Sequence, residues 1–335
     1  MTGEPRVLHL NDCAFVAANL VRAAARQGLR WDHLPPERVR PQVSPGGGLG
    51  RLRYAPYVAT RARALRRTDV VHVHYATSVR LLRERFMPAR PYLLHLHGTD
   101  IREQWTDPRY RDEITRAIAG AEHVFYTNLD TAENAHAARP DAEYMPAFVD
   151  PTTLPGWRPG GRRVVFASRW SRTKGAGTMI ALAAELRRAL PPEVRVQGLD
   201  WGEDSAAAAA VGVELLAQRP HAAYLDLLAT ADVVVGQATG LLGVSELEAM
   251  ALGVPVASPG VLLAHPEGGA PPVMSGTVAE TVDQVRAALE DPAAASERLD
   301  APRWVAEHYT ADRYVAPLQE RYRAAGTRRS RASAA

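Results

Sequence analysis

A turn in the second half of the chain carries two cations and a glycine in an arrangement that suits a phosphate group. Arg169 and Lys174 flank this turn, which follows the apolar run 164–167 and precedes a helix predicted over 178–190. The amides at a helix N-terminus attract anions, and cationic side chains strengthen that attraction. We therefore favour anion binding by Arg169 and Lys174 over the alternative of a solvated basic loop.

A second stretch, residues 231–257, points to the same chemistry. It contains a buried strand over 232–235, a glycine-rich loop, a helix that carries Glu248 in its early turns, and a further strand over 254–256. In an open α/β sheet, ligands bind beyond the carboxyl ends of the strands. The loop and the helix N-terminus are therefore predicted to complete a phosphate site.

Four histidines end two predicted strands, over 70–74 and 92–97, as His-x-His pairs. Side-chain alternation places the two members of each pair on a common face of the sheet. A metal site would need a converging ligand set, and no neighbouring carboxylate or thiolate pattern completes one. We predict packed or hydrogen-bonded rings and no metal at His72, His74, His95 and His97.

His97 differs from the other three because of the residues that follow it. His97-Gly98-Thr99-Asp100 lies where a strand ends and a helix is predicted to begin. Gly98 allows a close approach of the backbone, and Asp100 can cap the helix. A similar junction follows the first predicted strand, 7–10, where Asn11-Asp12 forms the turn and the helix N-cap.

The elements that carry these residues alternate as strands and helices, which indicates an α/β chain. Its 335 residues exceed one ordinary hydrophobic core and suggest two domains, separated by the proline- and glycine-rich linker 151–163. A net charge of +3 is too small to indicate a nucleic-acid partner. Without a leader segment or a membrane span, we expect a cytoplasmic protein.

A helix is predicted around 55–65, and the arginines between Arg51 and Arg67 cluster on one of its faces. This face suits an anionic lipid headgroup, an acidic acceptor or water, and we favour the solvated face over peripheral membrane contact. The preceding segment 35–50 is predicted to be a mobile loop.

Together these motifs resemble those of the GT-B glycosyltransferases, and specifically of the retaining group numbered family 4. Ser168-Arg169 with Lys174-Gly175 is similar to the turn whose Arg and Lys hold the donor diphosphate in that family. The run 248–256, EAMALGVPV, is similar to the family's segment in which the glutamate binds the nucleotide ribose. His97-Gly98-Thr99-Asp100 is similar to the element beside the donor sugar.

The resemblance implies two doubly wound Rossmann-like domains that face a central cleft. Residues 1–155 would form the acceptor-side domain, completed by a helix over about 308–325 that crosses back onto it. Residues 156–307 would bind the nucleotide sugar, and 326–335 would be a disordered basic tail.

Two positions depart from the family pattern. The family pairs two glutamates eight positions apart, and the first of them, which contacts the transferred sugar, is Gly240 here. Near the N-terminus, Asn11-Asp12-Cys13 stands where many relatives have a glycine pair. The first departure predicts an unusual donor sugar or a substitute contact from elsewhere.

The function implied is metal-independent retaining transfer of a sugar from a nucleoside-diphosphate sugar, with a UDP-sugar favoured, to a small-molecule acceptor. We expect a bacterial protein of secondary metabolism, such as antibiotic biosynthesis, or of glycoconjugate synthesis, acting without a cofactor as a monomer or homodimer. The alternatives are a sugar-nucleotide epimerase of the same fold and a catalytically silent, nucleotide-binding partner subunit. The predicted catalytic residues are His97, Arg169 and Lys174; the donor-binding residues are Gly98, Gly175, Gly240, Gly243, Val244, Ser245 and Glu248; the acceptor-side residues are Asn11, Asp12 and Asp100.

Overall fold

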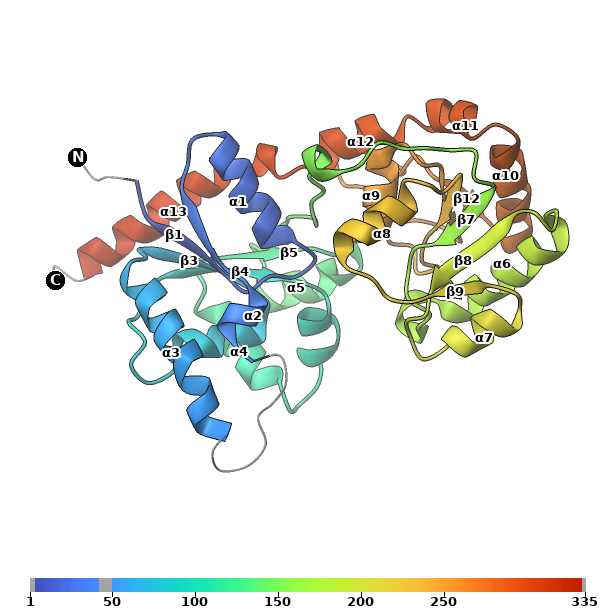
Figure 1. The fold of residues 1–335 in the computed structure, drawn as a ribbon. Coiled ribbons are helices and arrows are strands. Elements are labelled where there is room, and N and C mark those ends of the chain that lie inside the picture. Colours follow the sequence, from blue (N-terminus) through green and yellow to red (C-terminus); the bar gives the residue numbers. More distant parts are fainter. Residues whose placement is uncertain (1–3, 42–49, 333–335) are drawn as a thin grey trace. The chain divides into compact units, whose positions relative to one another are not determined.

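The computed structural model describes residues 4–41 and 50–332, and the contacts among them divide the chain into two compact units (Figure 1). Unit 1 comprises the chain up to Phe148 and again from Ala311, and unit 2 is the continuous segment Val149–Thr310. Each unit contains one six-stranded sheet whose strands all pair in parallel. The prediction of an α/β fold is confirmed.

The sheet of unit 1 has the strand order β2-β1-β3-β4-β5-β6. The chain first moves from β1 to β2 on one side, then returns past β1 to β3 and continues in the other direction. The point where the direction reverses, between β1 and β3, is the topological switch point of this sheet. The strands are β1 (Val7–Leu10), β2 (Trp31–Leu34), β3 (Val70–His74), β4 (Tyr92–Leu96), β5 (His123–Tyr126) and β6 (Glu143–Tyr144).

Helices cover both faces of this sheet. On one face, α1 (Val16–Arg26) and α13 (Asp312–Ala332) pack over an apolar cluster that includes Val7 and Val70. The other face packs against a second apolar cluster. This cluster includes Leu65 of α3 (Gly50–Arg66), Val79 of the 3-10 helix Ala76–Leu82 and Ile114 of α4 (Arg111–Ala119). Smaller elements complete the unit: α2 (Pro36–Val39), the turn Asp100–Gln104 and α5 (Ala132–Ala138).

The sheet of unit 2 has the order β12-β11-β10-β7-β8-β9, so its switch point lies between β7 and β10. The buried residues of β7 and β10 are apolar, as expected for parallel strands covered on both faces. The strands are β7 (Arg163–Phe166), β8 (Arg195–Leu199), β9 (Glu214–Leu216), β10 (Val233–Val235), β11 (Val256–Pro259) and β12 (Met274–Gly276).

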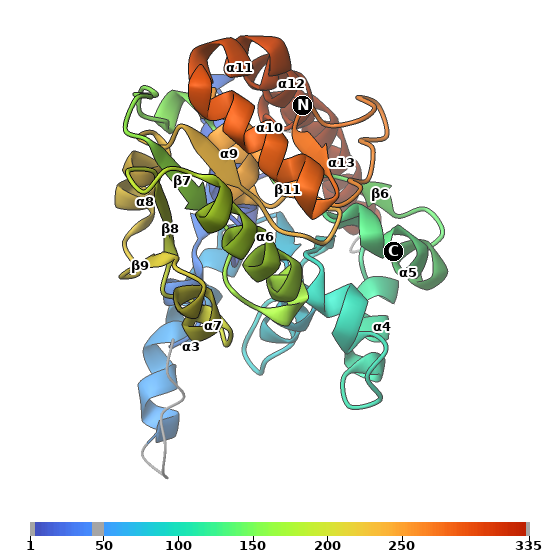
Figure 2. The same cartoon turned by 90° about the vertical axis from the view of Figure 1, so that its right-hand side faces the viewer.

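On one face of this sheet, α6 (Ala176–Ala189) and α10 (Val278–Glu290) lie side by side (Figure 2). The apolar cluster on the other face is completed by α8 (His221–Leu228), α9 (Val244–Leu252) and α12 (Ala301–His308). The remaining helices are α7 (Ser205–Ala210) and α11 (Pro292–Leu299). None of the helices in the described ranges has both the length and the apolar character of a bilayer span.

Several predicted elements are corrected. The alanine-rich sequence after Asp204 predicts a helix over 204–216, but the helix ends at Ala210, because Gly212 takes a φ of +93° that breaks it, and β9 follows. The tail expected to be disordered from 326 is helical as far as Ala332. Within the loop expected over 35–50, α2 forms, and residues 42–49 lie outside the described residues.

One arginine of the predicted solvated face is not solvated. Arg61 is only 1% exposed, and its guanidinium donates to the carbonyl of Val39 and to the carboxylate of Glu84. It therefore fastens α3 to unit 1, and the assignment of Arg61 to a solvated helix face is wrong.

Candidate functional site

The switch point of unit 2 is built from two segments that touch each other. The turn after β7, residues 168–175, meets the loop after β10, where the amide of Ala238 donates to the Lys174 carbonyl at 3.0 Å. Gly175 has a φ of +75°, and a Cβ there would lie 2.7 Å from the Ala238 carbonyl oxygen. Only glycine fits this position without movement, so the structure explains the Lys-Gly pair of the turn.

Two cations lie on this turn. Lys174 is half-buried, and its Nζ donates to Oε1 of Gln237, at 2.9 Å. Arg169 is exposed, with its guanidinium carbon 5.9 Å from the centre of the Trp201 ring and Nη2 3.4 Å from Thr173 Oγ1. Both are cationic groups on long side chains, so both can turn toward an anion at the ends of β7 and β10.

The N-terminus of α9 lies next to the same loop. Gly243 is its N-cap, no side chain caps the helix there, and Val244 and Ser245 begin it. The first amides of a helix have no partner within the helix, so those of Val244 and Ser245 are available to an anion. The predicted residues Gly175, Gly243, Val244 and Ser245 are thus brought together with Lys174.

Glu246 holds this arrangement from behind. It is 1% exposed, and its carboxylate accepts from the amides of Gln237 (2.8 Å) and Gly243 (3.0 Å) and from Ser168 Oγ (2.9 Å). It ties the ends of β7 and β10 to the start of α9.

Glu248 lies two residues after Glu246 on α9 and is 5% exposed. Its Oε1 is 2.7 Å from Nε2 of His221, the first residue of α8. A carboxylate has about four acceptor positions, so Glu248 can keep this bond and still accept from the hydroxyls of a ribose.

The backbone conformation at Gly240 disfavours a glutamate at this position. Its φ is +76°, and a Cβ would lie 2.9 Å from the carbonyl oxygen of Val261, in a segment fixed by the bond from the Leu263 amide to the Gly240 carbonyl. A side chain here is strained in any case. The path of this loop therefore favours glycine at position 240.

In unit 1, the residues after β1 are occupied with holding the fold. Asn11 donates to the carbonyl of His74 (3.0 Å) and to Ser78 Oγ (3.1 Å). Asp12 accepts from the amides of Ala17 and Ala18, and burial raises the pKa of its carboxyl. Asp12 thus binds the N-terminus of α1, which begins later than expected, at Val16.

Asp100 is fully buried and performs a similar task between two strands. Its oxygens accept from the amides of His97 (2.9 Å), Ile101 (3.0 Å) and Ala76 (3.0 Å), which joins the end of β4 to the end of β3. Burial raises the pKa of Asp100 to about 6. Beside it, Gly98 has a φ of +105° and abuts the side-chain amide of Asn128. The acceptor contacts of Asn11, Asp12 and Asp100 stay predictions.

The strand histidines share one face of the unit 1 sheet, as predicted. The rings of His72 and His74 lie 4.6 Å apart at an interplanar angle of 13°, and those of His95 and His97 lie 4.5 Å apart at 27°. His9 of β1 joins them through the register His9↔His72, which the sequence did not reveal.

Two histidine triplets have ring nitrogens within 4.8 Å of one another: His9, His72 and His74, and His74, His95 and His97. An imidazole binds a metal ion in the plane of its ring. In each triplet, one pair of rings lies face to face, so their lone pairs do not aim at one point. Of these residues His97 was predicted to be catalytic, and both of its ring nitrogens have partners within unit 1, His74 Nδ1 at 3.3 Å and Thr127 Oγ1 at 3.2 Å.

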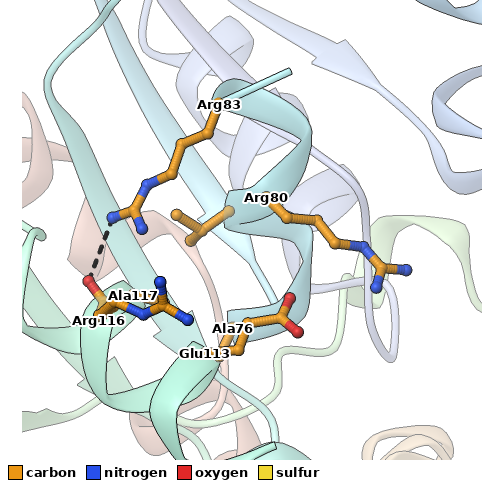
Figure 3. A pocket seen from close by; sticks show the side chains of 7 residues that line it. Ala76, Arg80, Arg83, Glu113, Arg116 and Ala117 are labelled. Atoms are coloured by element: carbon orange, nitrogen blue, oxygen red, sulfur yellow. Dashed lines mark hydrogen bonds between the residues drawn. The ribbon is translucent and has the colours of Figure 1, made fainter. Parts of the chain in front are cut away.

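A separate basic hollow of about 280 Å³ lies between the 3-10 helix Ala76–Leu82 and α4. Figure 3 shows the Arg83 guanidinium donating to the carbonyl of Arg116, with Arg80 and Glu113 on the opposite wall. No predicted site residue lines it.

Sequence reasoning missed Gln237, His221 and the structural part of Glu246. Gln237 directly follows the glycine that ends β10, which places it at the ligand-facing edge and could have revealed it. His221 lies 27 positions from Glu248 and carries no local signal.

No protein-family model matches the chain, and its sequence matches no curated relative. Solved structures do resemble it. Sucrose-phosphate synthase from Thermosynechococcus elongatus is 16% identical, with a TM-score of 0.62 over 95% of this chain and 98% of that one. HepE from Anabaena, solved with UDP and glucose, is 16% identical, with a TM-score of 0.64 over 94% and 98%.

A third structure, described as a putative UDP-N-acetylglucosamine 2-epimerase from Listeria monocytogenes, is 13% identical, with a TM-score of 0.54 over 94% of both chains. At these identities the likeness establishes the fold. The chain has the GT-B fold, as the sequence motifs predicted, and its structural neighbours are mainly glycosyltransferases.

Proposed function

We propose that the protein is a retaining glycosyltransferase of the family 4 type that transfers a sugar from a nucleoside-diphosphate sugar to a small-molecule acceptor without a metal ion. The observation that carries the proposal is the switch point of unit 2. There the turn with Arg169 and Lys174 meets the loop that leads from β10 to the first amides of α9, and the same helix carries the buried carboxylate of Glu248. HepE was solved with UDP and glucose, which supports a UDP-sugar as the donor.

The chemistry follows from where negative charge develops. Departure of the diphosphate is the difficult step, and Arg169, Lys174 and the amides of Val244 and Ser245 stabilise the charge on it. Such stabilisation often lowers a barrier by several kcal/mol in a site without water. In the family's usual scheme a phosphate oxygen takes the acceptor proton, so no carboxylate base is assigned.

His97 is proposed to position the sugar. Because both ring nitrogens already have partners, contact through the ring requires a sugar hydroxyl to replace Thr127 at Nδ1. The cellular setting proposed is the cytoplasm of a bacterium, in secondary metabolism or glycoconjugate synthesis.

The test is turnover of a panel of nucleoside-diphosphate sugars by Arg169→Ala, Lys174→Ala and the control Arg172→Ala. Arg172 is an exposed residue of the same turn and has no assigned role. We expect each of the first two variants to lower kcat about 100-fold, and the control to stay within about twofold of the unchanged protein. Unchanged turnover in Lys174→Ala would refute the assignment.

The epimerase alternative keeps one structural neighbour in its favour, and the products separate it from transfer. Epimerisation changes the donor sugar without an acceptor, whereas the proposed transferase releases nucleoside diphosphate. Binding of uridine diphosphate without turnover of any donor would instead favour a silent partner subunit.

A further inference from the structure

Five buried histidines of unit 1, His9, His72, His74, His95 and His97, lie side by side beneath α1 and α13, and we call them the histidine row. Three of them form one hydrogen-bonded chain. His9 Nδ1 is 3.1 Å from His74 Nε2, and His74 Nδ1 is 3.3 Å from His97 Nε2. The chain ends at Thr127 Oγ1 on one side and at the hydroxyl of Tyr322, from α13, on the other.

The tautomers of these rings are linked. A neutral imidazole has one donor nitrogen and one acceptor nitrogen, so in a chain that uses both, the tautomer of one ring determines the next. Two arrangements satisfy the chain, one with every ring protonated at Nε2 and one with every ring protonated at Nδ1.

The bond of Tyr322 at the end of the chain selects between them, and a separate bond determines the tautomer of His95, which lies outside the chain. The Met145 carbonyl can only accept, so His95 carries its proton on Nε2, 3.0 Å away. The hydroxyl of Tyr322 lies 2.7 Å from His72 Nδ1 and 3.4 Å from His9 Nε2. If it donates along the shorter contact, its oxygen accepts from the Nε2–H of His9, and the chain then runs through His74 and His97 with every proton on Nε2.

We propose that His9, His74 and Tyr322 are positioning residues that hold the His97 ring in the Nε2–H tautomer, so that its Nδ1 presents a lone pair to a hydroxyl group. In this structure that hydroxyl belongs to Thr127. Replacement of the Thr127 hydroxyl by a sugar hydroxyl rests on the proposed function. The tautomer of the rings in the histidine row does not depend on that function.

The surroundings keep the row neutral. Its ring nitrogens bond to one another, to Tyr322, to Thr127 and to the Met145 carbonyl, and in the described part of unit 1 no carboxylate is bonded to one of these rings. The neighbouring ionisable groups are engaged elsewhere: Asp12 beside His33 on β2, Glu143 and Arg321 beside His123 on β5, and Asp100 on its three amides. Burial lowers the pKa of every ring in the row, that of His95 to about 4.

The row also contains two buried nitrogens without a hydrogen-bond partner among the described residues, His72 Nε2 and His95 Nδ1. Burying a polar group without a partner destabilises a fold. Apolar residues would pack this face without that cost, which favours a functional reason for five histidines.

The test is imidazole ¹⁵N NMR at neutral pH on the full chain. We expect the Nε2–H tautomer at all five rings. His74→Phe should remove the Nε2 partner of His97 and convert it to a mixture of tautomers. Tyr322→Phe, which removes only a hydroxyl, should mix the linked tautomers of His9, His74 and His97. The matched control is His95→Phe, because it keeps a ring stacked on His97 and breaks no bond of the chain; it should leave His97 unchanged.

An Nδ1–H or protonated His97 in the unchanged protein would overturn the inference, as would an unaltered His97 signal in His74→Phe. If His74→Phe does not fold, Tyr322→Phe decides the question. In a turnover assay, His74→Phe should lower kcat about tenfold with little change in KM, and His95→Phe should change neither. Correct tautomers without any transfer would refute the proposed function and leave the tautomer assignment standing.

Discussion

The two sheets have the same topological feature, a switch point, but the groups around it differ. In unit 2 the switch point between β7 and β10 has open amides at the start of α9 and two cations on long side chains. In unit 1 the corresponding place between β1 and β3 is closed by Asn11, and the N-terminus of α1 already binds the carboxylate of Asp12.

Both units nevertheless use one buried carboxylate to tie their strand ends together, Asp100 in unit 1 and Glu246 in unit 2. The difference is therefore not in the scaffold but in the charged and polar groups beside it. Cations and helix amides attract an anion whereas the carboxylate of Asp12 repels one, so we expect the proposed phosphate contacts in unit 2.

Acidification should produce the largest difference between the stabilities of the two units. The pKa values of the histidine row are lowered, so the unfolded chain binds protons that the folded row does not, and stability is lost as the pH falls below about 6.5. The loss is about 1.4 kcal/mol per pH unit for each ring, and for His95 it continues to about pH 4. Asp100 and Asp12 act in the opposite direction, because the raised pKa of each carboxyl stabilises the fold as the pH falls, through about 6 for Asp100, but they are two groups against five.

Hydrogen exchange at pH 7.5 and 5.0, corrected for the intrinsic rates, measures this effect strand by strand. We expect β1, β3 and β4 to lose protection at the lower pH while β7 and β10, whose buried residues are apolar, retain it. Equal losses in both sheets would remove the proposed distinction.

Replacing the buried carboxylates should have the next largest effect. Asp100→Ala leaves three amides without an acceptor and should lower the free energy of unfolding by about 3–5 kcal/mol in urea denaturation. The control Asp130→Ala breaks a partly exposed ion pair with Arg102 and should cost about 1 kcal/mol or less. Glu246→Ala should destabilise similarly to Asp100→Ala but also weaken nucleotide binding, which Asp100→Ala should not do.

Glu248→Gln should sharpen the assignment within unit 2. If Glu248 accepts from a ribose, the variant should weaken uridine diphosphate binding about tenfold, or about 1.4 kcal/mol, and leave the affinity for inorganic diphosphate unchanged. Isothermal titration with both ligands makes the comparison. His221→Ala should show the same pattern with a smaller change, since His221 only orients the carboxylate. An equal loss for both ligands would contradict a ribose contact.

The smallest effects are expected from two glycines. Gly240→Ala should destabilise the protein by about 1 kcal/mol, because its φ is positive and the Val261 carbonyl is close. Gly177→Ala, in α6 and with no atom within 4 Å of the added Cβ, should instead stabilise it by about 0.5–1 kcal/mol. Thermal unfolding of the two variants gives the signs. A stable Gly240→Ala would mean that the loop can admit a side chain.

The sequence predicted the fold class because the strands and turns of this fold can be recognised from short local patterns. Apolar runs such as 233–235 mark buried parallel strands, and the motifs around Lys174 and Glu248 resemble one family. β2 escaped detection because Trp-Asp-His-Leu has no apolar run, although its first and last residues are buried. The end of α7 at Gly212 was missed because five consecutive alanines favour helix without fixing where it stops.

The site was predictable where one turn supplied several groups and not where strands brought groups together. Arg169, Lys174 and Gly175 lie within seven residues, but the contacts of Lys174 with Gln237 and of Glu248 with His221 depend on the order of strands. The histidine row shows the same limit, since His9 joins it only through the parallel pairing of β1 with β3.

The chain order of the two units has a consequence for folding during synthesis. Unit 2 is one continuous segment, so it can fold once Thr310 has left the ribosome. Unit 1 is made first but must wait for α13, whose Val315, Leu318 and Tyr322 cover one face of its sheet. Until then the earlier-made unit exposes an apolar surface and an incomplete hydrogen-bonded chain, and these long-range contacts make it the slower of the two to reach its native state.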